Sequence, residues 1–308
     1  MADIDCGKIK ENNKWGIFSK INQGRKNFRN WRYKVHFGSI ILKGLVWLSM
    51  ILTVAVLAFL ILYILINGIP NLSLDLFAFK STSKNVSMFP PLINTFIITF
   101  LSLLIAVPVG IASAVYMVEY AKRGNRLVKV VRVATETLSG IPSIVFGLFG
   151  YLFFVITLNW GYSLMAGVIT MAIMVLPLIV RTTEEALIAV PDSYREGSFG
   201  LGAGKLRTVM KVVLPDALPG ILSGISLSIG RIIGETAALI YTAGTVANLP
   251  KNLFSSTGSL AVHMYVLLNE GLHMKEAYAT AVILLLLVLF INGITKLVVS
   301  RITKNKGE

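Results

Sequence analysis

Six long apolar runs constrain this chain more than any other feature of its sequence. The hydrocarbon core of a bilayer is about 30 Å thick, so a helix needs roughly 20 apolar residues to cross it. Composition agrees, because 55% of the 308 residues are hydrophobic and only 14% are charged, too few to cover a soluble core. We therefore expect an all-α polytopic membrane protein with six transmembrane helices, at residues 44–66, 93–116, 141–158, 164–180, 221–241 and 277–299.

Lysine and arginine are distributed unevenly between the predicted connections. Ten precede residue 44, five lie in 117–140, five in 181–220 and four after residue 295, whereas the alternate connections hold only four. An excess of these residues marks the cytoplasmic side of a membrane. Both termini are therefore predicted to be cytoplasmic in a multi-pass protein of the cell (inner) membrane. The membrane orientation thus explains the net charge of +14. We therefore expect the lipid bilayer as a partner and no nucleic acid.

The predicted organisation has four parts. Residues 1–43 form a basic cytoplasmic segment, 44–66 the first transmembrane helix, 90–299 the main transmembrane domain, and 300–308 a cytoplasmic tail. The first segment mixes aromatic residues with its cations, which fits an interfacial helix on anionic lipid. A solvated tail fits the same composition. The single Cys6 has no possible intrachain partner, so no disulfide is expected.

The connection 181–219 is too long for a simple turn and has helical patterning. Ser193 and Glu196 are spaced as a capping box, which predicts a short helix that ends at Gly202 or Gly204. A second helix is expected over 205–214, with Val209, Val212 and Val213 on its apolar side and Pro215 ending it. The sequence thus predicts a small cytoplasmic helical module.

This module resembles the cytoplasmic coupling segment of permeases from ATP-binding-cassette importers. That family carries Glu-Ala-Ala, three residues, Gly, nine residues, an aliphatic residue, one residue, and Leu-Pro. The matching positions are Glu196, Gly197, Ser198, Gly202, Val212, Leu214 and Pro215. Two small residues replace the two alanines. The resemblance implies a coupling helix that docks on a separate ATPase subunit. The run 200–205 lacks the glycine and hydroxyl spacing of a phosphate-binding loop, so ATP is expected to bind a partner.

The fifth predicted span carries polar residues along one stripe. On a helical wheel Gly220, Gly224, Ser228, Arg231 and Glu235 fall on the same side, which therefore faces protein or water. An arginine in mid-membrane costs about 2.5–3.5 kcal/mol on insertion scales, so this one needs a partner or a task. Glu235, four residues on, can be its structural ion-pair partner. Alternatively, Arg231 lines a path and contacts an anion, while Glu235 moderates its grip.

Three segments resemble the phosphate-specific transport permeases, in particular the PstA-type subunit. They are 142–149 (PSIVFGLF), 176–184 (LPLIVRTTE) and 229–243 (IGRIIGETAALIYTA). Ala238 stands where that family often has proline. The resemblance implies a type I importer permease fold, Arg231 and Glu235 as translocation-path residues, and no cofactor. It also implies three kinds of partner: a PstC-type permease, a PstB-type ATPase dimer at the cytoplasmic face, and an extracytoplasmic phosphate-binding protein.

Other functions fit parts of the sequence. A permease for another oxyanion, such as sulfate or molybdate, would share the coupling segment. A receptor or scaffold without transport would share the spans but leave that segment unexplained. An intramembrane enzyme needs a nucleophile with a base, or metal ligands, at depth, and the spans contain no His or Asp. His263, Glu270, His273 and Glu276 match no recognised metal-site spacing, so no metal is expected. The resulting prediction is a non-catalytic permease subunit for inorganic phosphate.

Overall fold

The computed structural model describes residues 37–79, 86–122 and 124–304 of the chain. Contacts divide the chain into two units, residues 1–61 and 62–308. The predictions for Cys6 and most of segment 1–43 lie outside the described residues. The regular elements of the described residues are all helical, and in chain order they are α2 (Phe37–Gly68), η1 (Ile69–Asn71), η2 (Leu74–Phe77), α3 (Phe89–Val115), η3 (Tyr116–Tyr120), α4 (Arg126–Ser139), α5 (Ser143–Gly150), η4 (Tyr151–Thr157), α6 (Leu164–Ile188), α7 (Asp192–Gly200), α8 (Lys205–Thr208), η5 (Val209–Val213), α9 (Leu214–Ile233), α10 (Ala237–Thr242), α11 (Leu260–Glu270) and α12 (Met274–Lys304).

The described part of the first unit is the larger portion of α2. Every side chain from residue 41 to residue 61 is exposed, although this stretch is almost entirely apolar. A helix that is apolar on all sides is stable only where lipid or protein covers it. With the residues that follow, this helix is a candidate membrane span, Ile41–Asn71.

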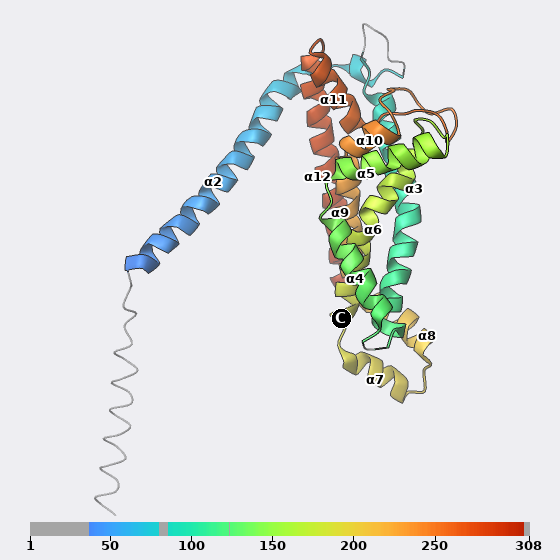
Figure 1. The fold of residues 1–308 in the computed structure, drawn as a ribbon. Helices are drawn as coiled ribbons and strands as arrows, with labels where there is room; N and C mark the ends of the chain where they lie inside the picture. The colour runs from blue at the N-terminus through green and yellow to red at the C-terminus, as the bar shows by residue number, and fades with distance from the viewer. Residues whose placement is uncertain (1–36, 80–85, 123, 305–308) are drawn as a thin grey trace, which may run out of the picture. The chain divides into compact units, whose positions relative to one another are not determined.

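In the described part of the chain, five helices are long and apolar enough to cross a membrane, and a sixth span results if one bent pair of helices is counted as one span. The expectation of an all-α membrane fold with six spans is therefore confirmed. The bent pair consists of α4 and α5 with η4, and its two parts differ in direction by 103°. The third span, expected at 141–158, corresponds to α5 with η4. This segment is long enough to cross a membrane only together with α4, which runs beside α6, whereas α5 crosses the bundle (Figure 1).

The bend between α4 and α5 has a local cause. Gly140 ends α4, and Pro142 precedes the first residue of α5 with an extended backbone, at ψ 143°. Proline also disfavours helical geometry at the residue before it, Ile141. The chain therefore leaves one helix and starts another within three residues, a change that apolar length alone does not reveal.

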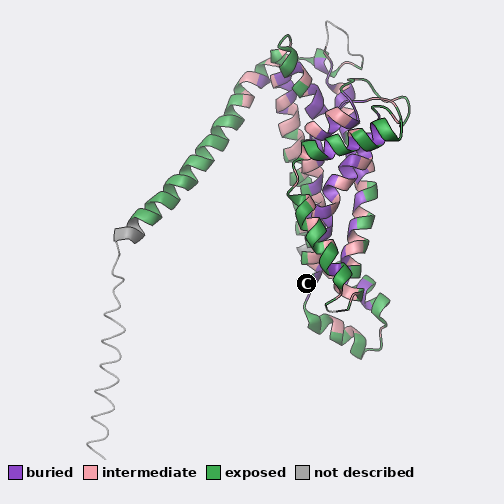
Figure 2. Ribbon diagram, viewed as in Figure 1, coloured by how far each residue is buried: buried purple, intermediate pink, exposed green. Residues whose placement is uncertain are grey.

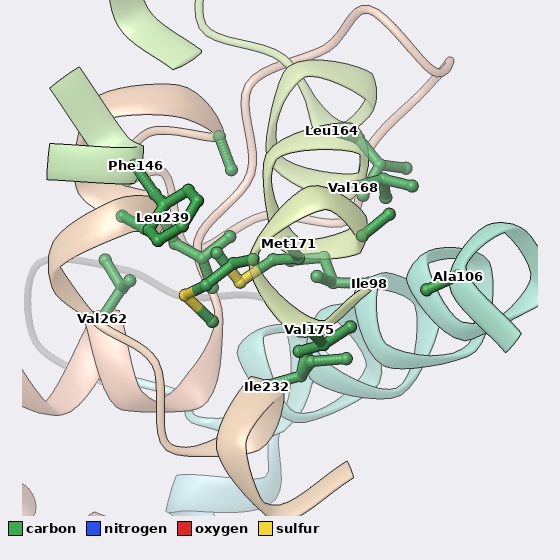
Figure 3. Close-up of a cluster of buried hydrophobic side chains, with 14 of the residues drawn as sticks. Ile98, Ala106, Phe146, Leu164, Val168, Met171, Val175, Ile232, Leu239 and Val262 are labelled. Carbon is green, nitrogen blue, oxygen red and sulfur yellow. The ribbon is translucent and has the colours of Figure 1, made fainter. Parts of the chain in front are cut away.

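The core of the second unit surrounds α6. Met171, Val175 and Ile179 are fully buried on this helix, and α3, α4, α5, α9 and α10 all contact it. Figure 3 shows side chains from these neighbours around Met171, among them Ile98 and Ile232. Most of α6 is buried on all sides (Figure 2), as expected for a helix that carries few charges before residue 181.

Two short helices close one end of this unit. Gly147 of α5 lies against the backbone of Ala238 in α10, where an added Cβ would be 2.8 Å from Ala238 Cα. Gly150 faces Thr170 of α6 and Thr242 of α10 in the same way. Small residues let these helices approach closely. The opposite end of the unit carries α7 and α8 (Figure 1).

Candidate coupling segment and translocation path

The predicted coupling segment folds as α7, a turn, and a second helix that continues into α9. Glu196 and Gly197 are exposed on α7, while Ser198 is half-buried and its Oγ lies 2.8 Å from Thr208 Oγ1 on α8. Gly202 has a φ of +82°, a conformation that favours glycine, and it turns the chain after α7. The predicted turn at Gly202 is therefore confirmed.

Two details of this segment differ from the prediction. Ser193 makes no capping hydrogen bond, because α7 already begins at Asp192, directly after the extended Pro191. The carboxylate of Asp192 lies in the first turn of α7 instead, where it interacts favourably with the positive end of the helix dipole. The proposed capping box of Ser193 and Glu196 was wrong.

Pro215 does not end the second helix, which continues from Lys205 to Ile233. The chain forms the π-turn η5 directly before α9, and Pro215 lies in the first turn of α9, where a missing N–H is tolerated. Leu214 and Pro215 therefore lie at the start of a span that is continuous with the coupling segment. Val209 and Val213 are buried, as expected for the apolar side.

Sequence reasoning missed Arg195, which joins α7 to the rest of the unit. Its Nε and Nη2 donate to Glu119 Oε1 at 3.0 and 2.8 Å. Its Nη1 donates to the carbonyl of Val190 at 2.7 Å and to Asp192 Oδ1 at 3.1 Å, and Nη2 donates to the carbonyl of Leu187 at 2.8 Å. Its place directly before Glu196 in the motif was the available signal, but its partner Glu119 is 76 residues away.

Arg231 and Glu235 do not form the ion pair that the helical wheel suggested. α9 ends at Ile233, with Gly234 as its C-cap, so Arg231 lies on this helix whereas Glu235 lies in the connection before α10. Glu235 is only 8% exposed, and its Oε1 accepts a hydrogen bond from the backbone N–H of Ala238 at 3.1 Å. The carboxylate therefore caps α10.

Arg231 is half-buried in the last turn of α9 and makes no hydrogen bond or ion pair with any residue that the structure describes. The partial negative charge at the C-terminal end of a helix favours a cation there. The guanidinium nonetheless keeps its five N–H donors available for an anion. The observed geometry thus leaves its charge without a carboxylate partner in the described part of the chain.

The two glycines of the stripe pack against α6, so this part of the stripe faces protein, one of the two predicted environments. A Cβ at Gly220 would lie 2.6 Å from Ala186 Cβ, and a Cβ at Gly224 would clash with the side chain of Thr182. Ser228 is fully buried, and its hydroxyl donates a hydrogen bond to the carbonyl of Gly224 at 3.0 Å. This face of α9 therefore faces protein.

Further charges lie on α4 and α6. Arg181 is not at the end of a helix, because α6 continues to Ile188, and Arg181 pairs with Glu185 at 3.0 Å. Arg132 of α4 pairs with Glu184 through a 2.6 Å hydrogen bond from its Nε.

Burial lowers the pKa of His263 to about 4, so this side chain is neutral at pH 7. No three His, Cys, Asp or Glu residues gather as possible metal ligands within the described ranges.

Comparison with known proteins places this architecture. Residues 106–304 match the family described as binding-protein-dependent transport system inner membrane component. The chain is 32% identical to the phosphate transport system permease protein PstA of Haemophilus influenzae, over 90% of this chain and 98% of that protein. It is 36% identical to the probable ABC transporter permease protein YqgI of Bacillus subtilis, over 74% of this chain and 83% of that protein.

Solved structures give the same fold. A permease chain of the MetNI methionine ABC transporter, in an inward-facing conformation, has a TM-score of 0.56 at 23% identity and covers 70% of this chain and 94% of its own. A chain of a bacterial alginate ABC transporter has a TM-score of 0.61 at 16% identity and covers 88% of this chain and 99% of its own. The chain belongs to the family of binding-protein-dependent transport system inner membrane components.

Proposed function

We propose that this chain is the permease subunit of an ATP-driven importer for inorganic phosphate, forms half of its translocation pore, and couples to a separate ATPase. The observation that carries the proposal is the 32% identity to a PstA protein over nearly the full length of both chains. The exposed α7 with its coupling motif supports coupling to an ATPase. Arg231, which has no hydrogen-bond or ion-pair partner among the described residues, supports an anionic cargo. Chemistry on ATP belongs to the partner in this scheme.

The surface of α7 and α8 fits a docking role. Tyr194, Phe199, Leu201 and Leu206 are 51%, 47%, 90% and 67% exposed, beside the exposed Glu196. Large apolar side chains that gather on a solvent-exposed surface indicate a protein interaction site. The partner in this scheme is a PstB-type ATPase dimer, on the cytoplasmic side that also holds both termini.

In this proposal the other two partners bind at the sides of the bundle and at its opposite end. A PstC-type permease supplies the second half of the pore, and an extracytoplasmic phosphate-binding protein delivers the cargo at the end formed by α5, α10 and α11. Arg231 contacts phosphate as it passes, because a guanidinium binds phosphate oxygens in a bidentate manner. Glu235 was expected to be a counter-ion of Arg231. In this proposal it instead stabilises the break in the fifth span, because its carboxylate accepts a hydrogen bond from the first turn of α10.

The cargo is tested by uptake of radiolabelled phosphate in cells that lack this chain, with radiolabelled sulfate as control. Selective loss of phosphate uptake, restored by the wild-type chain, is the expected result. Loss of sulfate or molybdate uptake with unchanged phosphate uptake would assign the chain to another oxyanion. Unchanged uptake of all three would support a receptor or scaffold that does not transport.

Charge reversal at Glu196 tests the docking surface. Glu196 is exposed and makes no bond within the described residues, so Glu196→Lys should leave the fold of this chain intact. We expect ATP hydrolysis to continue while phosphate import falls about tenfold, since an energetic coupling between sites is worth about 5–150-fold. The measurement is the ratio of ATP hydrolysed to phosphate imported in proteoliposomes.

The matched control is Glu136→Lys, the same charge change on an exposed residue of α4. It should keep the wild-type ratio. A normal ratio in Glu196→Lys would remove Glu196 from the docking surface.

A further inference from the structure

Arg195 uses every donor of its guanidinium. The five N–H groups of an arginine side chain match the five hydrogen bonds described above, two to Glu119, two to backbone carbonyls and one to Asp192. The carbonyls of Leu187 and Val190 lie at the end of α6, where four carbonyls lack helical partners. One side chain therefore fixes three elements to each other: α7, the end of α6 and the π-turn η3.

The pair is shielded from water. The side chains of Arg195 and Glu119 are 14% and 8% exposed, whereas the second carboxylate partner, on Asp192, is 80% exposed. A charged hydrogen bond is stronger where water is excluded, and removal of one partner leaves a buried charge without compensation. The contact to Glu119 therefore matters more than the contact to Asp192.

The element that receives this contact is unusual. Residues 116–120 form a π-turn that continues directly from α3, and such turns are rare and often lie at functional sites. The same turn receives a second contact from the coupling segment, because Lys205 Nζ of α8 lies 5.2 Å from the centre of the Tyr120 ring. Both helices of the coupling segment thus hold η3.

The remainder of α7 offers few other bonds to the bundle. In the described part of the chain, the side chains of α7 that bond to other elements are Arg195, to η3 and the end of α6, and Ser198, to α8. Tyr194, Glu196, Gly197 and Phe199 are exposed. A force applied to the outer face of α7 therefore reaches α3 and α6 through Arg195.

We infer that the Arg195–Glu119 ion pair is the link that transmits movement of α7 to the spans α3 and α6. Arg195 is a positioning residue, and it acts on transport through Glu119 and the π-turn rather than by contact with cargo or ATP. The inference rests on the proposed function, because it needs a partner that moves α7. It adds a specific transmitting contact, from the residue directly before the motif to the end of the second span.

The test uses the complete complex reconstituted in proteoliposomes with the binding protein. Glu119→Gln removes the charge and keeps the shape, and Arg195→Lys keeps the charge and removes the planar fork. We expect each variant to hydrolyse about tenfold more ATP per phosphate imported than the wild type. Copurification with the ATPase should stay near wild type, which separates transmission from assembly.

The double variant Glu119→Gln/Arg195→Lys completes a mutant cycle. Because both residues act through one contact, its ratio should equal that of the more impaired single variant rather than the product of the two effects. The matched control is Glu276→Gln, the same change in a carboxylate that lies 3.6 Å from His273 at the start of α12. This control should keep the wild-type ratio.

The two levels of the proposal fail in different ways. A wild-type complex that hydrolyses ATP and imports no phosphate would overturn the proposed cargo. A wild-type complex that imports phosphate, together with a normal ratio in Glu119→Gln and Arg195→Lys, would overturn the transmission role. Multiplied effects in the double variant would also overturn it, because the two residues would then act independently.

Discussion

Replacement of Arg231 by alanine is expected to abolish phosphate import while the complex still assembles. Arg231 makes no hydrogen bond or ion pair with the described residues, so its removal breaks no polar contact with them. Charged hydrogen bonds contribute about 1.5–3 kcal/mol each, and two lost bonds to a phosphate correspond to a decrease of about 100-fold or more in transport. Initial rates of radiolabelled phosphate uptake measure this effect.

The control for Arg231→Ala is Arg301→Ala, which removes an exposed arginine near the end of α12. It should leave uptake unchanged. Copurification of the ATPase with Arg231→Ala reports assembly. If that variant failed to assemble, the arginine would be a structural residue of the bundle, and the path assignment would be lost.

Gly224→Leu should have the largest effect on stability. The position faces Thr182 of α6 so closely that even a methyl group would overlap the threonine side chain. Overpacking in a closed interface costs about 3 kcal/mol or more when several atoms are added. We expect α9 to separate from α6, so that little chain accumulates in the membrane and the Tm of the remaining complex falls by several degrees.

Gly293→Leu is the matched control for this change. Gly293 lies in α12, and a Cβ there would meet no atom within 4 Å. The two variants change hydrophobicity and helix propensity equally, so a difference between them reports the contact with α6. Equal accumulation and equal Tm would show that α9 and α6 do not pack as described.

The features that sequence predicted are those set by local pattern. Apolar length indicated the spans, and small residues at positions 220 and 224 indicated a face directed away from lipid, because both follow from the pattern along one helix. The pattern did not identify α6 as the partner of that face. The turn at Gly202 was predictable from the residue type, since glycine adopts positive φ more readily than other residues. The coupling motif was recognisable from fixed spacing.

The features that sequence did not predict depend on where helices break and on contacts far along the chain. The wheel that paired Arg231 with Glu235 extended a helix through Gly234, where it ends. Conversely, Pro215 was read as an end although the helix continues through it. Arg195 and Glu119 come together only after α3, α6 and α7 have packed, so no short window contains both.

The π-turn η5 gives the length of the coupling motif a mechanical meaning. A π-turn holds more residues per turn than an α-helix, and each residue of an α-helix rotates the chain by about 100°. If one residue were lost between Gly202 and Pro215, α7 would rotate by about that angle relative to α9, and Arg195 would face away from Glu119. The number of residues between Gly202 and Pro215 thus sets the rotational phase of the docking helix, whatever side chains fill the interval.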